Sequence, residues 1–154
     1  MFVNPVAERN SCKFGFLPGT LLEKILGSQI GNFLASKLGS IEMVYNLIEQ
    51  GKIEFIATAD ARGYEALNTR CAIYMTEAQN TTIDMMKLLL ERFGEDTIGV
   101  FEGDTECQVD NVNYENGNNG LKRLCEVYKG EPYFGTVTLV NCYRSKIAKH
   151  ALNM

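Results

Sequence analysis

Two hydrophobic periodicities alternate along this chain, and their alternation restricts the fold more than any other feature. Short apolar or alternating runs at residues 53–57, 72–75, 98–101 and 134–140 predict strands. Amphipathic stretches at residues 41–50, 83–93, 120–128 and 144–152 predict helices between and after them. Strands and helices in alternation are typical of a parallel sheet with helices on both faces. The sequence therefore predicts an α/β fold.

Local signals mark the ends of two of these helices. Ser40 can cap the helix at residues 41–50, and Gly51 follows its last turn. Thr81 or Thr82 can cap the helix at residues 83–93, which Gly94 ends. The amphipathic stretches are thus bounded by residues suited to helix ends.

The composition indicates one globular domain over residues 1–154. Apolar residues make up 45% of the chain and charged residues 22%. With a net charge of −4, the chain has no basic field to hold nucleic acid by charge alone, although a partner could supply one. No run of about eighteen apolar residues and no signal peptide is present, so we expect a cytoplasmic protein without a membrane span. The five scattered cysteines form no C-x-x-C and accompany a single histidine, His150, so we interpret them as reduced and mostly structural.

Polar segments follow three of the predicted strands. They are residues 76–80, 103–104 and 141–144. Because functional groups of parallel α/β sheets gather at the carboxyl ends of the strands, we expect these segments to lie side by side on one rim. An Asn-rich stretch at residues 110–120 predicts a long surface loop, a feature that is more often functional than decorative.

Taken in order, these segments resemble the PhoH-like proteins, a family of P-loop ATPases related to superfamily-1 helicases. Residues 76–82, T-E-A-Q-N-T-T, are similar to the Walker B stretch D-E-A-Q-N-T-T of that family. The further matches are G-F-L-P-G-T at residues 15–20 with E-K at 23–24, Arg62-Gly63, G-D-T-E-C-Q at residues 103–108, N-G-L at residues 119–121 and R-S-x-I-A at residues 144–148. The resemblance runs nearly from end to end, and it implies a three-layer RecA-like P-loop NTPase fold with a mostly parallel sheet.

Two departures from the family pattern affect the phosphate and metal sites. The chain has no G-x-x-x-x-G-K-[S/T], so the phosphate-binding loop and its lysine are missing. The resemblance then implies a fold incomplete at its N-terminus, without the first strand, the P-loop and the first helix. Thr76 stands where the family has the Walker B aspartate that supports Mg²⁺, and a threonine hydroxyl is neutral.

The resemblance also implies roles for particular side chains. Glu77, Gln108 and Arg144 would be catalytic: Glu77 would polarise the attacking water, Gln108 would sense the γ-phosphate, and Arg144 would contact that phosphate in cis or in trans. The residues that would contact the nucleotide are Thr76, Gln79, Asp104 and Arg62, and those that would face Mg²⁺ are Thr76 and Glu77. Each also has a plain structural interpretation, such as a carboxylate at a helix N-terminus for Glu77, a Gly-Asp turn for Asp104, or a solvated arginine at a helix start for Arg144.

We therefore predict an ATPase domain fragment that is inactive alone. ATP and Mg²⁺ are the ligands that the resemblance implies, and we expect them to bind only when the missing piece of the site is supplied. The fragment would need a P-loop-containing fragment or a homo-oligomer, because a sheet without its P-loop strand has an unpaired edge and uncovered apolar faces. The alternative is a non-enzymatic assembly module, or a module that holds single-stranded RNA or DNA between subunits. A decaying gene product without a selected role is a third interpretation.

Overall fold

The computed structural model describes residues 2–4, 29–57, 70–104, 114, 117–141 and 143–151. The described strands form one sheet with the order β2-β1-β3-β4. Its strands are β1 (Phe2–Asn4), β2 (Phe55–Ala57), β3 (Cys71–Met75) and β4 (Thr97–Phe101). All the described pairings are parallel, with Ala72 opposite Ile98 and Met75 opposite Phe101. The predicted α/β class with a parallel sheet is confirmed.

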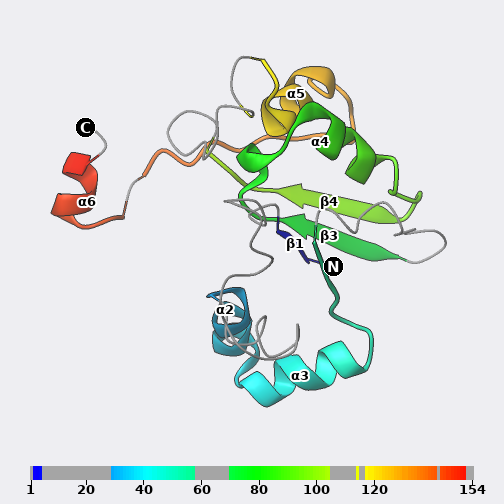
Figure 1. The fold of residues 1–154 in the computed structure, drawn as a ribbon, viewed down its shortest axis with the longest axis vertical. Coiled ribbons are helices and arrows are strands. Elements are labelled where there is room, and N and C mark those ends of the chain that lie inside the picture. The colour runs from blue at the N-terminus through cyan, green and yellow to red at the C-terminus, as the bar shows by residue number, and fades with distance from the viewer. Residues whose placement is uncertain are drawn as a thin grey trace.

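The described helices gather in two places. Helices α4 and α5 lie together over one face of β3 and β4, α2 and α3 pack against each other on the opposite side, and α6 stands apart (Figure 1). Their bounds are α2 (Gln29–Leu38), α3 (Ile41–Glu49), the short 3-10 helix η3 (Ala78–Asn80), α4 (Ile83–Leu90), α5 (Gly120–Val127) and α6 (Lys146–Ala151). No helix in these stretches is long and apolar enough to cross a membrane.

The main core lies between β3 and the two helices above it. Its buried members are Ile73, Met75, Ala78, Met86, Leu89, Leu121 and Leu124. Phe101 of β4 packs against this cluster and stacks on Phe93, with ring centroids 6.2 Å apart. This face of the sheet is therefore a packed α/β layer, and it holds the ends of β3 and β4 in place.

The predicted N-caps of α3 and α4 are present, whereas Gly94 does not end α4, which stops at Leu90 with Glu91 as its C-cap. The Ser40 hydroxyl accepts a hydrogen bond from the Met43 N–H at the start of α3, and Gly51 follows its end with a φ of +65°. At α4 the cap is Thr82, whose hydroxyl accepts from the Met85 N–H. The Thr81 hydroxyl instead donates to the Ala78 carbonyl, so the alternative between the two threonines is resolved in favour of Thr82.

The expectation that residues 72–75 are buried on both faces is wrong. Ile73 and Met75 are fully buried against the helices, but Ala72 is exposed on the other face. On that face of β4, Ile98 and Val100 are 61% and 46% exposed. An apolar strand is buried twice only when helices cover both faces of its sheet, and among the described elements α4 and α5 cover one.

Residues 134–140 do not form the predicted strand. They belong to none of the described strands, and Val137, Leu139 and Val140 are almost fully exposed. β-Branched residues favour a strand only where a neighbouring strand is available for pairing. The other differences are shifts of element ends: β2 starts at Phe55, α6 is shorter than the predicted 144–152, and Phe93 lies beyond α4.

Candidate functional site

The segments that follow β3 and β4 meet at one rim of the sheet. The Glu102 N–H donates to the Met75 carbonyl at 3.0 Å, and the Ala78 N–H donates to the Glu102 carbonyl at 2.8 Å. These bonds extend the contact between the two strands into the loops beyond them. They confirm that residues 76–80 and 103–104 share a rim, as parallel strands require.

Glu77 presents its carboxylate at this rim from an unusual backbone conformation. Its φ is 52° and its ψ is 36°, the left-handed region that non-glycine residues seldom occupy. The carboxylate Oε2 accepts a hydrogen bond from the Gln79 Nε2 at 2.6 Å. Strained residues of this kind gather at functional sites, where the surrounding structure holds them in place.

Gln79 connects three segments of the chain. Its side chain is 0% exposed, and its Oε1 accepts from the Asp104 N–H at 3.3 Å. Its main-chain carbonyl accepts from the Asn119 Nδ2 at 2.8 Å. Gly103 lies directly against it, since a Cβ at that position would be 2.2 Å from the Gln79 Oε1. The loops after β3 and β4 and the start of α5 are thereby held together around Gln79, through its side-chain amide and its main-chain carbonyl.

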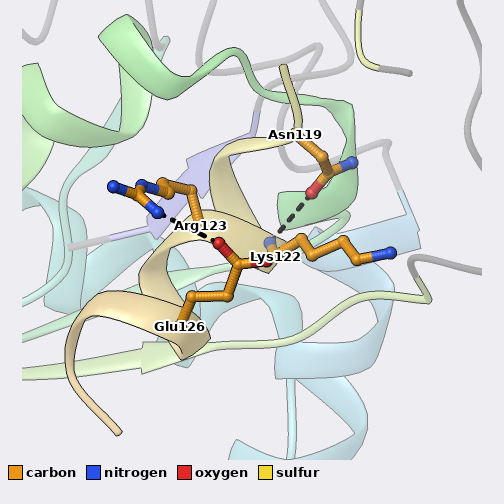
Figure 2. Close-up of polar contacts among 4 residues, drawn as sticks. All are labelled: Asn119, Lys122, Arg123 and Glu126. Atoms are coloured by element: carbon orange, nitrogen blue, oxygen red, sulfur yellow. Dashed lines mark hydrogen bonds and ion pairs between the residues drawn. The ribbon is translucent and has the colours of Figure 1, made fainter. Parts of the chain in front are cut away.

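Asn119 is a site residue whose individual role the sequence reasoning missed. Figure 2 shows it at the start of α5, where its Oδ1 accepts from the Lys122 N–H at 3.0 Å and caps the helix. The same figure shows Arg123 paired with Glu126 along that helix, at 3.2 Å. An asparagine directly before an amphipathic run is an N-cap signature, and this signal could have identified it.

For the remaining predicted site residues, the described structure gives no contact that joins them to Glu77. Thr76 is half-buried at the end of β3. Arg144 is exposed, and no hydrogen bond or ion pair within the described ranges joins it to Glu77. Arg62 and Gln108 lie outside the described residues. The roles implied for these four side chains stay predictions.

The donors at the rim do not make a metal site by themselves. The described residues contain no group of three or more His, Cys, Asp or Glu side chains that could hold a metal ion. Of the two candidate Mg²⁺ ligands, Thr76 is neutral and only Glu77 offers a carboxylate. A Mg²⁺ ion at this rim would take its other oxygen ligands from phosphates and water, as this ion commonly does.

On the face of the sheet that α4 and α5 do not cover, Tyr74 carries a perturbed hydroxyl near the rim. The Tyr74 hydroxyl donates to the Glu102 Oε2 at 2.5 Å. Burial, the hydrogen bond and the charge of Glu102 together raise the pKa of Tyr74 to about 12. A hollow of about 250 Å³ lies elsewhere, on the exposed side of α4, where it is lined by Asp84, Met85, Lys87, Leu88 and Glu91. None of the rim residues lines this hollow, so it is separate from the candidate site.

Comparison with known proteins gives consistent results. The family model described as PhoH-like protein matches residues 1–154. The chain is 34% identical to protein PhoH2 of Bacillus subtilis over 147 aligned residues. These residues make up 91% of this chain and 32% of that relative. It is 31% identical to protein PhoH of Escherichia coli K12 over 145 aligned residues, and these residues make up 90% of this chain and 39% of that relative. The chain thus spans between 32% and 39% of the length of these curated relatives.

Proposed function

The chain belongs to the PhoH-like protein family of P-loop ATPases, and from that premise we propose that it forms the water-activating and phosphate-sensing half of an ATPase site. A P-loop outside residues 1–154, on a partner or in a further segment, completes the site. The observation that carries this proposal is the meeting of Glu77 and the Asp104 loop at the ends of β3 and β4, in a chain without G-x-x-x-x-G-K-[S/T].

The charges at the rim support inactivity of the chain alone. Phosphoryl transfer depends almost wholly on positioning the phosphates and stabilising their negative charge. Glu77 is itself acidic, and no cation within the described ranges pairs with it. The P-loop lysine and its row of backbone N–H groups supply the missing positive potential. Without them a triphosphate would be repelled from this rim.

The edge strand of the described sheet supports the need for a P-loop segment. β4 is the last strand in the described order, and the exposed Ile98 and Val100 leave one of its faces bare. A parallel strand added beside β4 would end on the same rim as Glu77, and a helix after it would cover Ile98 and Val100. One strand–P-loop–helix unit therefore satisfies both the sheet and the nucleotide site, and it would complete a three-layer RecA-like fold.

A non-enzymatic assembly module is the second candidate. It is favoured by the exposure of four large apolar or aromatic side chains, Val137, Leu139, Val140 and Tyr143, which a protein partner would remove from water. A role in holding single-stranded nucleic acid is less favoured, since the net charge of −4 opposes it unless another subunit supplies positive charge.

Reconstitution tests the proposal. The purified chain is mixed with a polypeptide that carries the strand, P-loop and helix of a longer family member, and calorimetry with ATP and Mg²⁺ is combined with phosphate-release kinetics. We expect no binding by the chain alone, and binding with hydrolysis by the pair. A partner with its P-loop lysine changed to alanine is the control for the phosphate site, and Glu77→Gln is the control for the chemistry.

Two results would contradict the proposal. Hydrolysis by the chain alone at the rate of the pair would show that the P-loop is dispensable. A stable pair that never hydrolyses ATP would favour the assembly module.

A further inference from the structure

We propose that Gln79 is a positioning residue that holds the Glu77 carboxylate and couples it to the loop after β4, without touching the nucleotide. This inference rests on the proposed function, because it takes Glu77 as the group that activates water. It departs from the sequence-based expectation that Gln79 itself binds nucleotide.

The two ends of the Gln79 amide suit this role. A glutamine side chain both donates and accepts, and here Nε2 donates to the Glu77 Oε2 while Oε1 accepts from the Asp104 N–H. The bond to Glu77 is 2.6 Å long and is assisted by the charge of the carboxylate. With 0% of the residue exposed, Gln79 could reach a ligand only by breaking these bonds inside the protein, where an unsatisfied amide is costly.

Glu77 needs such a partner because its own backbone does not fix it. Left-handed φ and ψ values are unfavourable for a glutamate, and η3 begins directly after it. Its side chain makes no capping bond to that short helix. The hydrogen bond from Gln79 is therefore the described contact that orients the carboxylate.

Gln79 is itself held from two directions. The Asn119 side chain binds its carbonyl at 2.8 Å, and Gly103 leaves no free space beside its Oε1. A displacement of residues 103–104, such as a phosphate at Asp104 would cause, must therefore move the Gln79 amide and with it the Glu77 carboxylate. In this way the state of the sensing loop reaches the group that activates water.

The kinetic test uses the complete complex with Gln79→Met, which keeps the length of the side chain and removes both hydrogen bonds. We expect kcat to fall by on the order of 100-fold, because a carboxylate misplaced by about 1 Å can cost that much, with KM for ATP almost unchanged. In a Glu77→Gln background the same change should have little further effect. The control is Gln50→Met, at an exposed glutamine after α3.

A raised KM with normal kcat would show that Gln79 binds nucleotide and would overturn the inference. Equal kcat values for the wild-type and Gln79→Met complexes would also overturn it. If the wild-type complex hydrolyses no ATP, the proposed function itself fails, and a measurement on the chain alone then decides the role of Gln79.

That measurement is the NMR signal of the Gln79 side-chain amide, with Gln50 as an internal reference. We expect the Gln79 amide protons to exchange slowly with solvent, because the residue is buried and its Nε2 donates to the Glu77 Oε2. In Glu77→Gln, which removes the charged acceptor, we expect the chemical shifts of these protons to change while those of Gln50 stay the same. Rapid exchange like that of Gln50, or Gln79 shifts that are equal in the wild type and in Glu77→Gln, would refute the link even if Gln79→Met failed to fold.

Discussion

Replacing Gly120 with alanine would test how closely α5 approaches α4. A Cβ at Gly120 would lie 2.6 Å from the Thr82 carbonyl oxygen and 2.8 Å from the Met86 Cβ, closer than the 3.0 Å that real Cβ atoms keep. Neither of these atoms can rotate away, so the two helices must separate. Overpacking of this kind costs about 1–3 kcal/mol, and the better helix propensity of alanine offsets about 1 kcal/mol at most.

We expect a net loss of about 1–2 kcal/mol in the free energy of unfolding and a fall in Tm of roughly 2–8 °C. The assay is urea unfolding followed by circular dichroism. Gly135→Ala is the matched control, because a Cβ there meets nothing within 4 Å, and it should stay within about 0.5 kcal/mol of the wild type. If the two variants unfold at the same urea concentration, the close approach of α5 to α4 is refuted.

Three further outcomes can be measured on the same chain. Leu89→Ala should lose about 2–5 kcal/mol of unfolding free energy in urea, since Leu89 is 1% exposed within the core; a loss like that of a surface change would contradict the core assignment. Thr82→Ala should lose about 1 kcal/mol, with Thr82→Ser close to the wild type, because the hydroxyl caps α4. In a spectrophotometric titration, Tyr74→Phe should remove a phenol that ionises near pH 12, and Glu102→Gln should lower the pKa of Tyr74. Because folding raises this pKa from 10.0, the stability it contributes is complete below pH 10 and lost as the pH rises through about 12, which unfolding at several alkaline pH values would verify.

Helix ends could be predicted from the sequence because the signals that set them are local. Ser40 binds an N–H only three residues ahead of it, and Gly51 adopts its positive φ within the same turn. Neither depends on distant parts of the chain. The sequence left the choice between Thr81 and Thr82 open, although the contact that decides it is also local, since the Thr81 hydroxyl donates to the Ala78 carbonyl three residues before it.

The strand at residues 134–140 and the two-sided burial of residues 72–75 were predicted wrongly, because both depend on neighbours outside the segment itself. Residues 134–140 have strand composition, yet they join no described strand. The apolar run at residues 72–75 suits burial on both faces, yet Ala72 and its neighbour Ile98 are exposed. The composition of a segment indicates whether it suits a strand or a buried position. The rest of the fold determines whether a neighbouring strand or a covering helix is present.

In the candidate site, too, some features could be predicted from the sequence and others depended on distant segments. The meeting of Glu77 with the Asp104 loop follows from two adjacent parallel strands and was predictable. The buried position of Gln79 was not, since it requires Gly103 and Asn119 to arrive from two other segments.

The left-handed backbone at Glu77 has a consequence for protein engineering. Glycine at this position would relieve strain on the order of 1 kcal/mol and would remove the carboxylate from the rim. A library of this chain screened only for heat resistance should therefore be enriched in variants that have discarded the acid. Thermostability and chemistry are opposed at this one residue, so any screen needs a second selection for nucleotide turnover.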